Sequence, residues 1–149
     1  MDNNEMIDRL NDLIQLDVDA VEAYNQVLKH LEYEDLCRRL ARYQDDHKNH
    51  IENLSAAIVD LGGTPAERKP DFKGYLMELF TFLMSASGSI GAVEVMKANE
   101  ILTNRKYAKA AALQWPDEIK TVILNNYSQE QRHLRFIEEI LSIPRHELR

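Results

Sequence analysis

The chain has 149 residues, 44% of them hydrophobic and 29% charged, which is ordinary for one globular domain with a sizeable core. The formal net charge of −7 argues against a nucleic-acid partner, because no basic face offsets the phosphates. The lone cysteine rules out an intramolecular disulfide, and no run approaches the roughly 18 apolar residues of a membrane span. The first residues are too polar for a secretory signal. These observations together predict a cytoplasmic protein.

The first half of the chain predicts two long helices joined by a short turn. Residues 4–31 carry apolar side chains about every 3.5 positions, as one face of a helix does. A second helix is predicted over 34–61, because Gly62 and Gly63, followed by Pro65, are typical of a helix end. A basic cluster near the start of this helix is expected to be a solvated face: Arg38, Arg39 and Arg42.

Residues 62–86 form a connector that is too long for a hairpin turn between helices. The connector begins polar and becomes strongly apolar from Tyr75 to Met84, which predicts a short helix over about 74–86. This apolar run is expected to cover the core or a homodimer partner. A helix of about 28 residues is roughly 42 Å long, and a connector of this size can run its full length.

The second half again predicts two helices and a short turn. They cover about 87–112 and 117–142, with a break at Pro116 and an end before Pro144. No alternation of strand period occurs, so the fold class is all-α. Short turns make the helices of each half antiparallel neighbours, and the long connector becomes a single crossover between the second and third helices. Residues 1–149 are therefore predicted to form one four-helix bundle.

One spacing of polar residues occurs in both halves. An acidic residue is followed by a tyrosine after 7 positions, by a histidine or glutamate after 30, and by a histidine after 33. The first set is Asp17, Tyr24, His47 and His50, and the second, 83 residues later throughout, is Glu100, Tyr107, Glu130 and His133. Because the acidic and histidine positions fall near the midpoints of the four predicted helices, their side chains are expected to meet at mid-bundle.

Carboxylates and imidazoles in this arrangement point to a metal site. These groups suit iron, manganese and zinc, and His47 with His50, like Glu130 with His133, share one helix face at a spacing of three. The two tyrosines of the repeat are expected to pack in the core and to hydrogen-bond the ligands. The predicted function is therefore metal binding at the centre of the bundle.

At these residues the chain resembles the ferritin-like superfamily, and it looks closest to small bacterial members described as domains of unknown function. That pattern places a carboxylate on the first and third helices and Glu-x-x-His on the second and fourth. Glu130, His133 and Glu100 match it, while Asp17 stands where a glutamate is usual. The resemblance implies one or two metal ions, iron first, and redox chemistry with oxygen or peroxide such as oxidation of ferrous ion.

Position 47 departs from that pattern, because it is a histidine where the family has a bridging glutamate. A carboxylate has two oxygens and can span two metals, whereas a neutral imidazole offers one lone pair. The neighbouring Asp46 is expected to point about 100° away around the helix and to face solvent. One metal is expected to be held by Asp17, His47 and His50. The second is expected to be held by Glu100 and His133, with Glu130 bridging the two metals.

The same departure leaves a metal-free alternative open. Three carboxylates now face three histidines, and protonated histidines could neutralise the acids in a hydrogen-bonded network. On this interpretation the chain is a non-catalytic helical bundle with a polar core, acting as a structural or interaction module.

Overall fold

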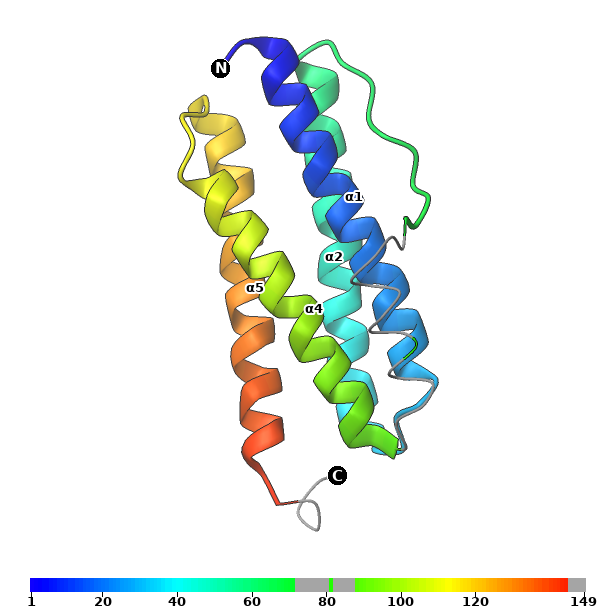
Figure 1. Ribbon diagram of the computed structural model, residues 1–149. Helices are drawn as coiled ribbons and strands as arrows, with labels where there is room; N and C mark the ends of the chain where they lie inside the picture. The colour runs from blue at the N-terminus through cyan, green and yellow to red at the C-terminus, as the bar shows by residue number, and fades with distance from the viewer. Residues whose placement is uncertain (72–80, 82–87, 145–149) are drawn as a thin grey trace.

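The computed structural model describes residues 1–71, 81 and 88–144. Four long helices account for most of them, and no strand occurs in these ranges, so the all-α prediction is confirmed (Figure 1). The predicted short helix over 74–86, with its expected contact to the core or to a homodimer partner, lies outside the described residues except for Thr81. The helices are α1 (Asn3–Leu28), α2 (Glu34–Asp60), α4 (Gly88–Ala111) and α5 (Asp117–Ser142).

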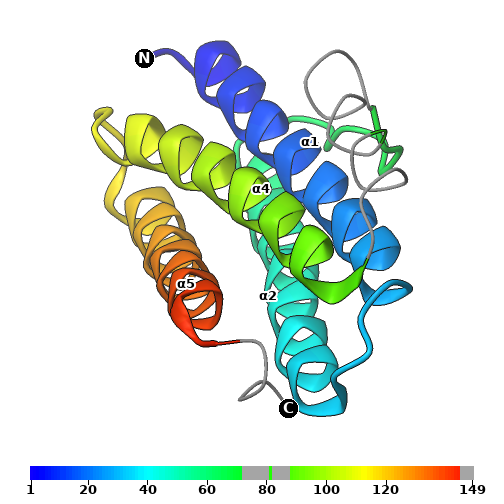
Figure 2. The ribbon, with the colours of Figure 1, turned by 60° about the horizontal axis from the view of Figure 1, so that its bottom comes forward.

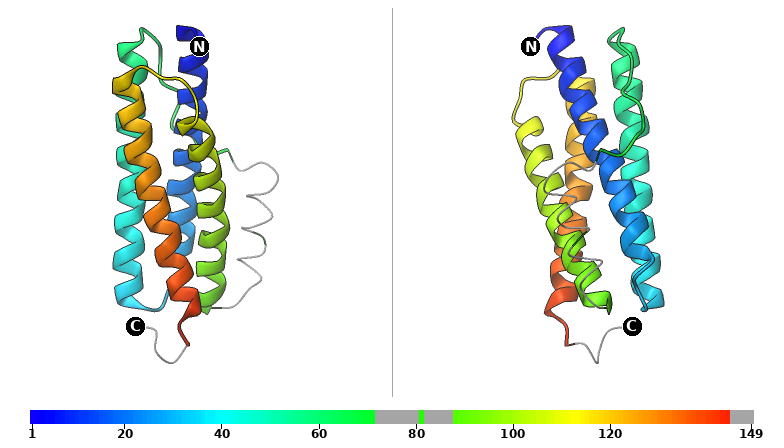
Figure 3. Two further views of the ribbon diagram at one scale, coloured as in Figure 1. Left: turned by 90° about the vertical axis from the view of Figure 1, so that its left-hand side faces the viewer. Right: turned by 45° about the vertical axis from the view of Figure 1, so that its right-hand side comes forward.

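The helices form two antiparallel pairs that pack against each other. α1 lies against α2 and α4 against α5, while α1 also contacts α4 and α2 contacts α5 (Figures 1 and 2). α2 and α4 run in the same direction along the bundle, so the chain between them must return along its length (Figure 3). This is the predicted four-helix bundle with one long crossover.

The observed helix ends agree with the predicted ones to within three residues. Asp2 caps α1 by accepting a hydrogen bond from the Glu5 backbone N–H at 2.8 Å, and the Glu5 carboxylate accepts one from the Asp2 N–H. The largest difference is at the end of α1, which stops at Leu28 rather than residue 31. Leu31 continues the apolar repeat, but it packs on the core from the turn that leads into α2.

Gly62 and Gly63 end α2 for two different reasons. Gly62 has a φ of 83°, a left-handed conformation that costs glycine little. Gly63 is needed for space, because a Cβ there would lie 2.7 Å from Ile7 Cδ1. Any other residue at position 63 would therefore have to displace the side chains of Ile7 and Ile58.

The described part of the connector is held on α1 by a row of polar side chains spaced four residues apart. The Asn11 side chain accepts a hydrogen bond from the Ala66 N–H at 2.7 Å, and that of Asp19 accepts one from the Asp71 N–H at 2.7 Å. Between them, the Gln15 amide donates to the backbone oxygen of Lys69 at 2.8 Å. A spacing of four keeps the three side chains on one face of the helix, so the connector follows that face.

Two hydrophobic clusters fill the bundle interior, one toward each end. The first includes the fully buried Leu10, Ile14, Leu54, Ile58 and Ile123, and the second includes Tyr24, Leu40, Met96 and Ile137. Between them lies a layer of buried polar side chains from all four helices. None of the described helices combines the length and apolar character that crossing a bilayer requires.

Candidate metal centre

The buried polar layer contains all six side chains that the sequence singles out as metal-competent. Each has at most 1% of its surface exposed, although ionisable side chains are rarely buried so completely without partners. α1 and α4 contribute one side chain each, and α2 and α5 contribute two each. The six are Asp17, His47, His50, Glu100, Glu130 and His133.

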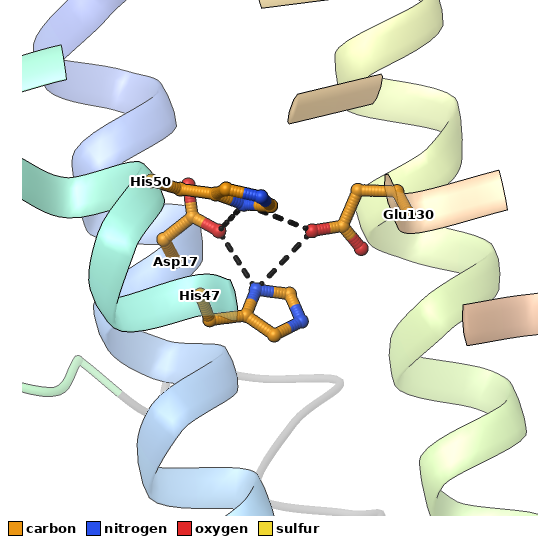
Figure 4. Close-up of side chains that lie close together, drawn as sticks. All are labelled: Asp17, His47, His50 and Glu130. Atoms are coloured by element: carbon orange, nitrogen blue, oxygen red, sulfur yellow. Dashed lines mark hydrogen bonds and ion pairs between the residues drawn. The ribbon is translucent and has the colours of Figure 1, made fainter. Parts of the chain in front are cut away.

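Four of these side chains form a first group, from α1, α2 and α5 (Figure 4). Asp17 Oδ1 lies 2.7 Å from His47 Nδ1 and 3.1 Å from His50 Nδ1. On the opposite side, Glu130 Oε1 lies 3.2 Å from the His47 nitrogen and 3.3 Å from the His50 nitrogen. Two carboxylate oxygens thus face the same two ring nitrogens.

A second group shares two members with the first. His47 Nε2 lies 3.2 Å from Glu100 Oε1, whereas its Nδ1 faces Asp17 of the first group. The two nitrogens of this ring therefore face one group each. His133 Nδ1 lies 3.5 Å from the same Glu100 oxygen and 3.8 Å from Glu130 Oε2. His47 and Glu130 therefore stand between the two groups, and the two carboxylate oxygens of Glu130 face different sides.

Two polar atoms at the centre have no hydrogen-bond partner among the described residues. Glu130 Oε1 and His133 Nδ1 are both buried, and neither makes a hydrogen bond of acceptable geometry there. A buried polar atom left in this way is costly, so it calls for an explanation. In each group, four ligand atoms lie within 4.8 Å of one another, which is compatible with a shared cation. Oxygen and imidazole donors of this kind fit iron, manganese or zinc.

The two tyrosines of the repeat reach across to the opposite half. The Tyr24 hydroxyl donates to Glu100 Oε1 at 2.5 Å, and the Tyr107 hydroxyl donates to Asp17 Oδ2 at 2.5 Å. Thr103 adds a hydroxyl 2.8 Å from Glu130 Oε2. These contacts fix the direction in which the carboxylates point.

A second pair of hydrogen bonds between the two halves involves two residues that the sequence did not assign to the site. His133 Nε2 lies 2.8 Å from Asp46 Oδ2, and His50 Nε2 lies 2.6 Å from Gln129 Oε1. Asp46 and Gln129 are also 83 residues apart, so the repeat itself contains the signal that could have found them. Both rings thereby turn Nδ1 toward the centre, as outer hydrogen bonds do for metal-binding histidines.

The expectation that Asp46 faces solvent is wrong. Its side chain is only 31% exposed and holds His133. The angle of about 100° from His47 is correct for an α-helix, but α5 lies on that side of α2. The direction that would be solvent for an isolated helix is an interhelical contact in the bundle.

Burial and the neighbouring charges set the ionisation of the carboxylates. Burial raises the pKa of Asp17, but hydrogen bonds with His47 and His50 outweigh it and hold the pKa below its usual value. Burial opposes ionisation of Glu100 as well, yet two histidine rings keep its pKa well below the usual range. For Glu130, burial and then the nearby Glu100 charge dominate, so its pKa is raised.

The histidines show the complementary effect. Burial lowers the pKa of each ring, but the facing carboxylates outweigh it. The pKa of His47 lies well above its usual value, that of His50 is raised to about 9, and that of His133 to about 10. The protonated rings thus stabilise the metal-free fold below neutral pH, and this contribution is lost as the pH rises through about 9 to 10.

Residues 5–114 match a family described as a domain of unknown function, DUF2383. The chain belongs to the DUF2383 family. Within this DUF2383 protein, the match covers α1 from residue 5 onward and all of α2 and α4, whereas α5, which carries Glu130 and His133, lies beyond it. A search of curated proteins gave no match.

Two solved structures are similar to this DUF2383 chain over nearly all of its length. One is the bacterioferritin-related protein of Bacteroides fragilis, described as a dodecameric thioferritin, with 15% identity, a TM-score of 0.76, and coverage of 95% of this chain and 87% of that one. The other is described as a ferritin-like, diiron-carboxylate protein from Bacillus anthracis str. Ames, with 19% identity, a TM-score of 0.70, and coverage of 95% and 100%. Both confirm that the fold is ferritin-like.

Proposed function

We propose that this chain is a metal-binding protein that holds two transition-metal ions at the centre of the bundle. Asp17, His47 and His50 would hold one ion, and Glu100 and His133 the other. Glu130 would bridge, because its two oxygens face different groups, whereas a neutral imidazole at position 47 offers only one lone pair. The observation that carries the proposal is the buried Glu130 oxygen that faces two ring nitrogens without a hydrogen bond.

Iron is the first expectation, and manganese and zinc are the alternatives. The Bacillus anthracis structure is described as a diiron-carboxylate protein, and the ligand types here suit iron. Iron bound at this place would supply redox chemistry with oxygen or peroxide, such as oxidation of ferrous ion. The single cysteine fits a reducing, cytoplasmic setting for this activity.

The test is elemental analysis of the full chain purified without added chelator, followed by titration with ferrous, manganous and zinc ions. We expect about two ions per chain at saturation. Less than about 0.2 ion per chain, with no uptake of any of the three, would overturn the proposal. Oxygen consumption on addition of ferrous ion then separates oxidation from binding alone.

The competing function is a structural or interaction module with a metal-free polar core. The hydrogen bonds that already engage most of the central side chains favour it. It requires that no metal binds, and that replacing His47 and His50 by asparagine changes the stability of the fold without changing metal content. The titration above decides between the two.

Metal affinity is expected to rise with pH. The raised pKa values, about 9 for His50 and about 10 for His133, mean that both rings carry a proton at neutral pH in the metal-free chain. A protonated ring must lose its proton before it can ligate the metal. The logarithm of the apparent metal affinity should therefore rise by about one per pH unit for each proton released. Zinc titrations between pH 6 and 8.5 measure this slope, and a flat profile would show that the rings do not ligate.

Removing the Asp46 carboxylate should weaken one metal position. Asp46→Ala frees His133 Nε2, and the loss of such an outer hydrogen bond typically costs about 10- to 100-fold in metal affinity. Asp45→Ala is the matched control, because Asp45 is exposed on the same helix and, among the described residues, forms its ion pair with Lys48 rather than with a residue of the centre. Equal affinities for the two variants in a competition titration with a chromophoric chelator would contradict the role given to His133.

A further inference from the structure

A hollow of about 660 Å³ lies on the outside of the bundle, between α2 and α5. His133 and Asp46 form part of its lining, so it adjoins the candidate metal centre from outside. Four arginines line it, Arg39 and Arg42 from α2 and Arg132 and Arg135 from α5. Each pair is spaced by three residues, which places both guanidinium groups of a pair on one face of its helix.

The three arginines of the expected solvated face, Arg38, Arg39 and Arg42, have different surroundings in the structure. Arg38 is paired with Glu34 and with Asp35 on its own helix. Arg39 and Arg42, by contrast, line the hollow, and among the described residues neither they nor the two arginines of α5 form an ion pair with a carboxylate. Within the part of the chain that the structure describes, the hollow is thus lined by four guanidinium-bearing side chains that have no carboxylate partner.

Aromatic side chains hold part of this arrangement in position. The Arg39 guanidinium lies over the Phe136 ring, 4.6 Å from its centre, and Tyr43 stacks on His133 with ring centres 4.2 Å apart. A guanidinium on an aromatic face is stabilised and restricted in its motion. Phe136 and Tyr43 therefore already have stacking partners within the chain, and the arginines are the cationic groups that the hollow offers to a ligand.

The charges around the hollow favour an anion. Among the described residues, the carboxylates that line the hollow beside the four arginines are Asp46 and Glu139, and Asp46 is engaged by His133. This is a local excess of positive charge in a chain whose net charge is −7. The planar fork of arginine matches the oxygens of phosphate and carboxylate groups, with which it forms paired hydrogen bonds.

We propose that this hollow binds a small oxyanion with two or more negative charges, a phosphate or a dicarboxylate. The anion lies between the arginine pairs of α2 and α5, on the outer side of His133 and Asp46. Binding does not require a metal ion, so it stands or falls separately from the function proposed for the centre.

The experiment is isothermal titration calorimetry of the full, metal-free chain at low ionic strength with inorganic phosphate, and separately with malonate. We expect saturable 1:1 binding of at least one of them. The double variant R42Q/R132Q removes one guanidinium from each wall and should weaken that binding by at least about tenfold. All four arginines are exposed, so this variant should keep the wild-type unfolding temperature.

The control is Arg38→Gln, which removes a positive charge from the same helix outside the hollow. It should bind the anion as the wild type does. If neither anion saturates the wild type below about 10 mM, or if Arg38→Gln loses as much affinity as the double variant, the hollow is not an oxyanion site.

Discussion

Replacing Glu130 with glutamine is expected to lower the affinity for both metal ions by at least about a hundredfold. Glutamine keeps the shape of the side chain but loses the negative charge and one of the two ligating oxygens. Because the oxygens of Glu130 face different groups, one substitution should affect both positions. Zinc competition titration measures the affinities, and metal content of the purified variant gives the stoichiometry.

The glutamine variant should still fold, so a loss of binding can be interpreted. Burial and the Glu100 charge already disfavour ionisation of Glu130 and raise its pKa. Glu138→Gln, at an exposed position of the same helix, is the matched control and should bind metal normally. If Glu130→Gln retained both ions at wild-type affinity, Glu130 would not be the bridge.

Replacing His47 with glutamate should destabilise the metal-free protein and strengthen its response to metal. His47 faces Asp17, Glu100 and Glu130, and a fourth carboxylate would leave excess negative charge buried. Loss of one partner from a buried ionic network costs about 3–5 kcal/mol of unfolding free energy. Metal ions bind only the folded state and should restore much of that loss.

Urea unfolding with and without zinc measures both effects. His47→Gln is the companion variant, because it removes the ring without adding charge, and it should lose less stability than the glutamate variant. A metal-free His47→Glu chain as stable as the wild type would show that the carboxylates do not depend on His47. A destabilised chain that zinc fails to rescue would favour the metal-free polar core.

The four helices and the central polar layer could be predicted because both depend on spacing along the chain. An apolar period near 3.5 and the breaks at Gly62 and Pro116 give helix positions to within a few residues. The constant offset of 83 residues then brings Asp17 and Glu100, with their histidine partners, to the same level of the bundle. Their burial follows, because residues at mid-helix on an apolar face can lie only in the interior.

Contacts between helices could not be predicted in the same way, because they depend on how each helix is rotated against its neighbour. The geometry of α2 alone predicts that Asp46 faces solvent, whereas the packing of α5 against α2 brings it to His133. The same packing gathers Arg42 and Arg132 around one hollow, although they are far apart in the sequence.

Periodicity and spacing are properties of one chain, so they predict the four long helices, the single crossover and the six central side chains. Which ring nitrogen faces which carboxylate, and that the two Glu130 oxygens face separate groups, can be read only from the folded bundle. These contacts depend on how side chains pack between helices, because the rotation of a helix about its own axis decides whether a residue faces solvent or a neighbouring helix.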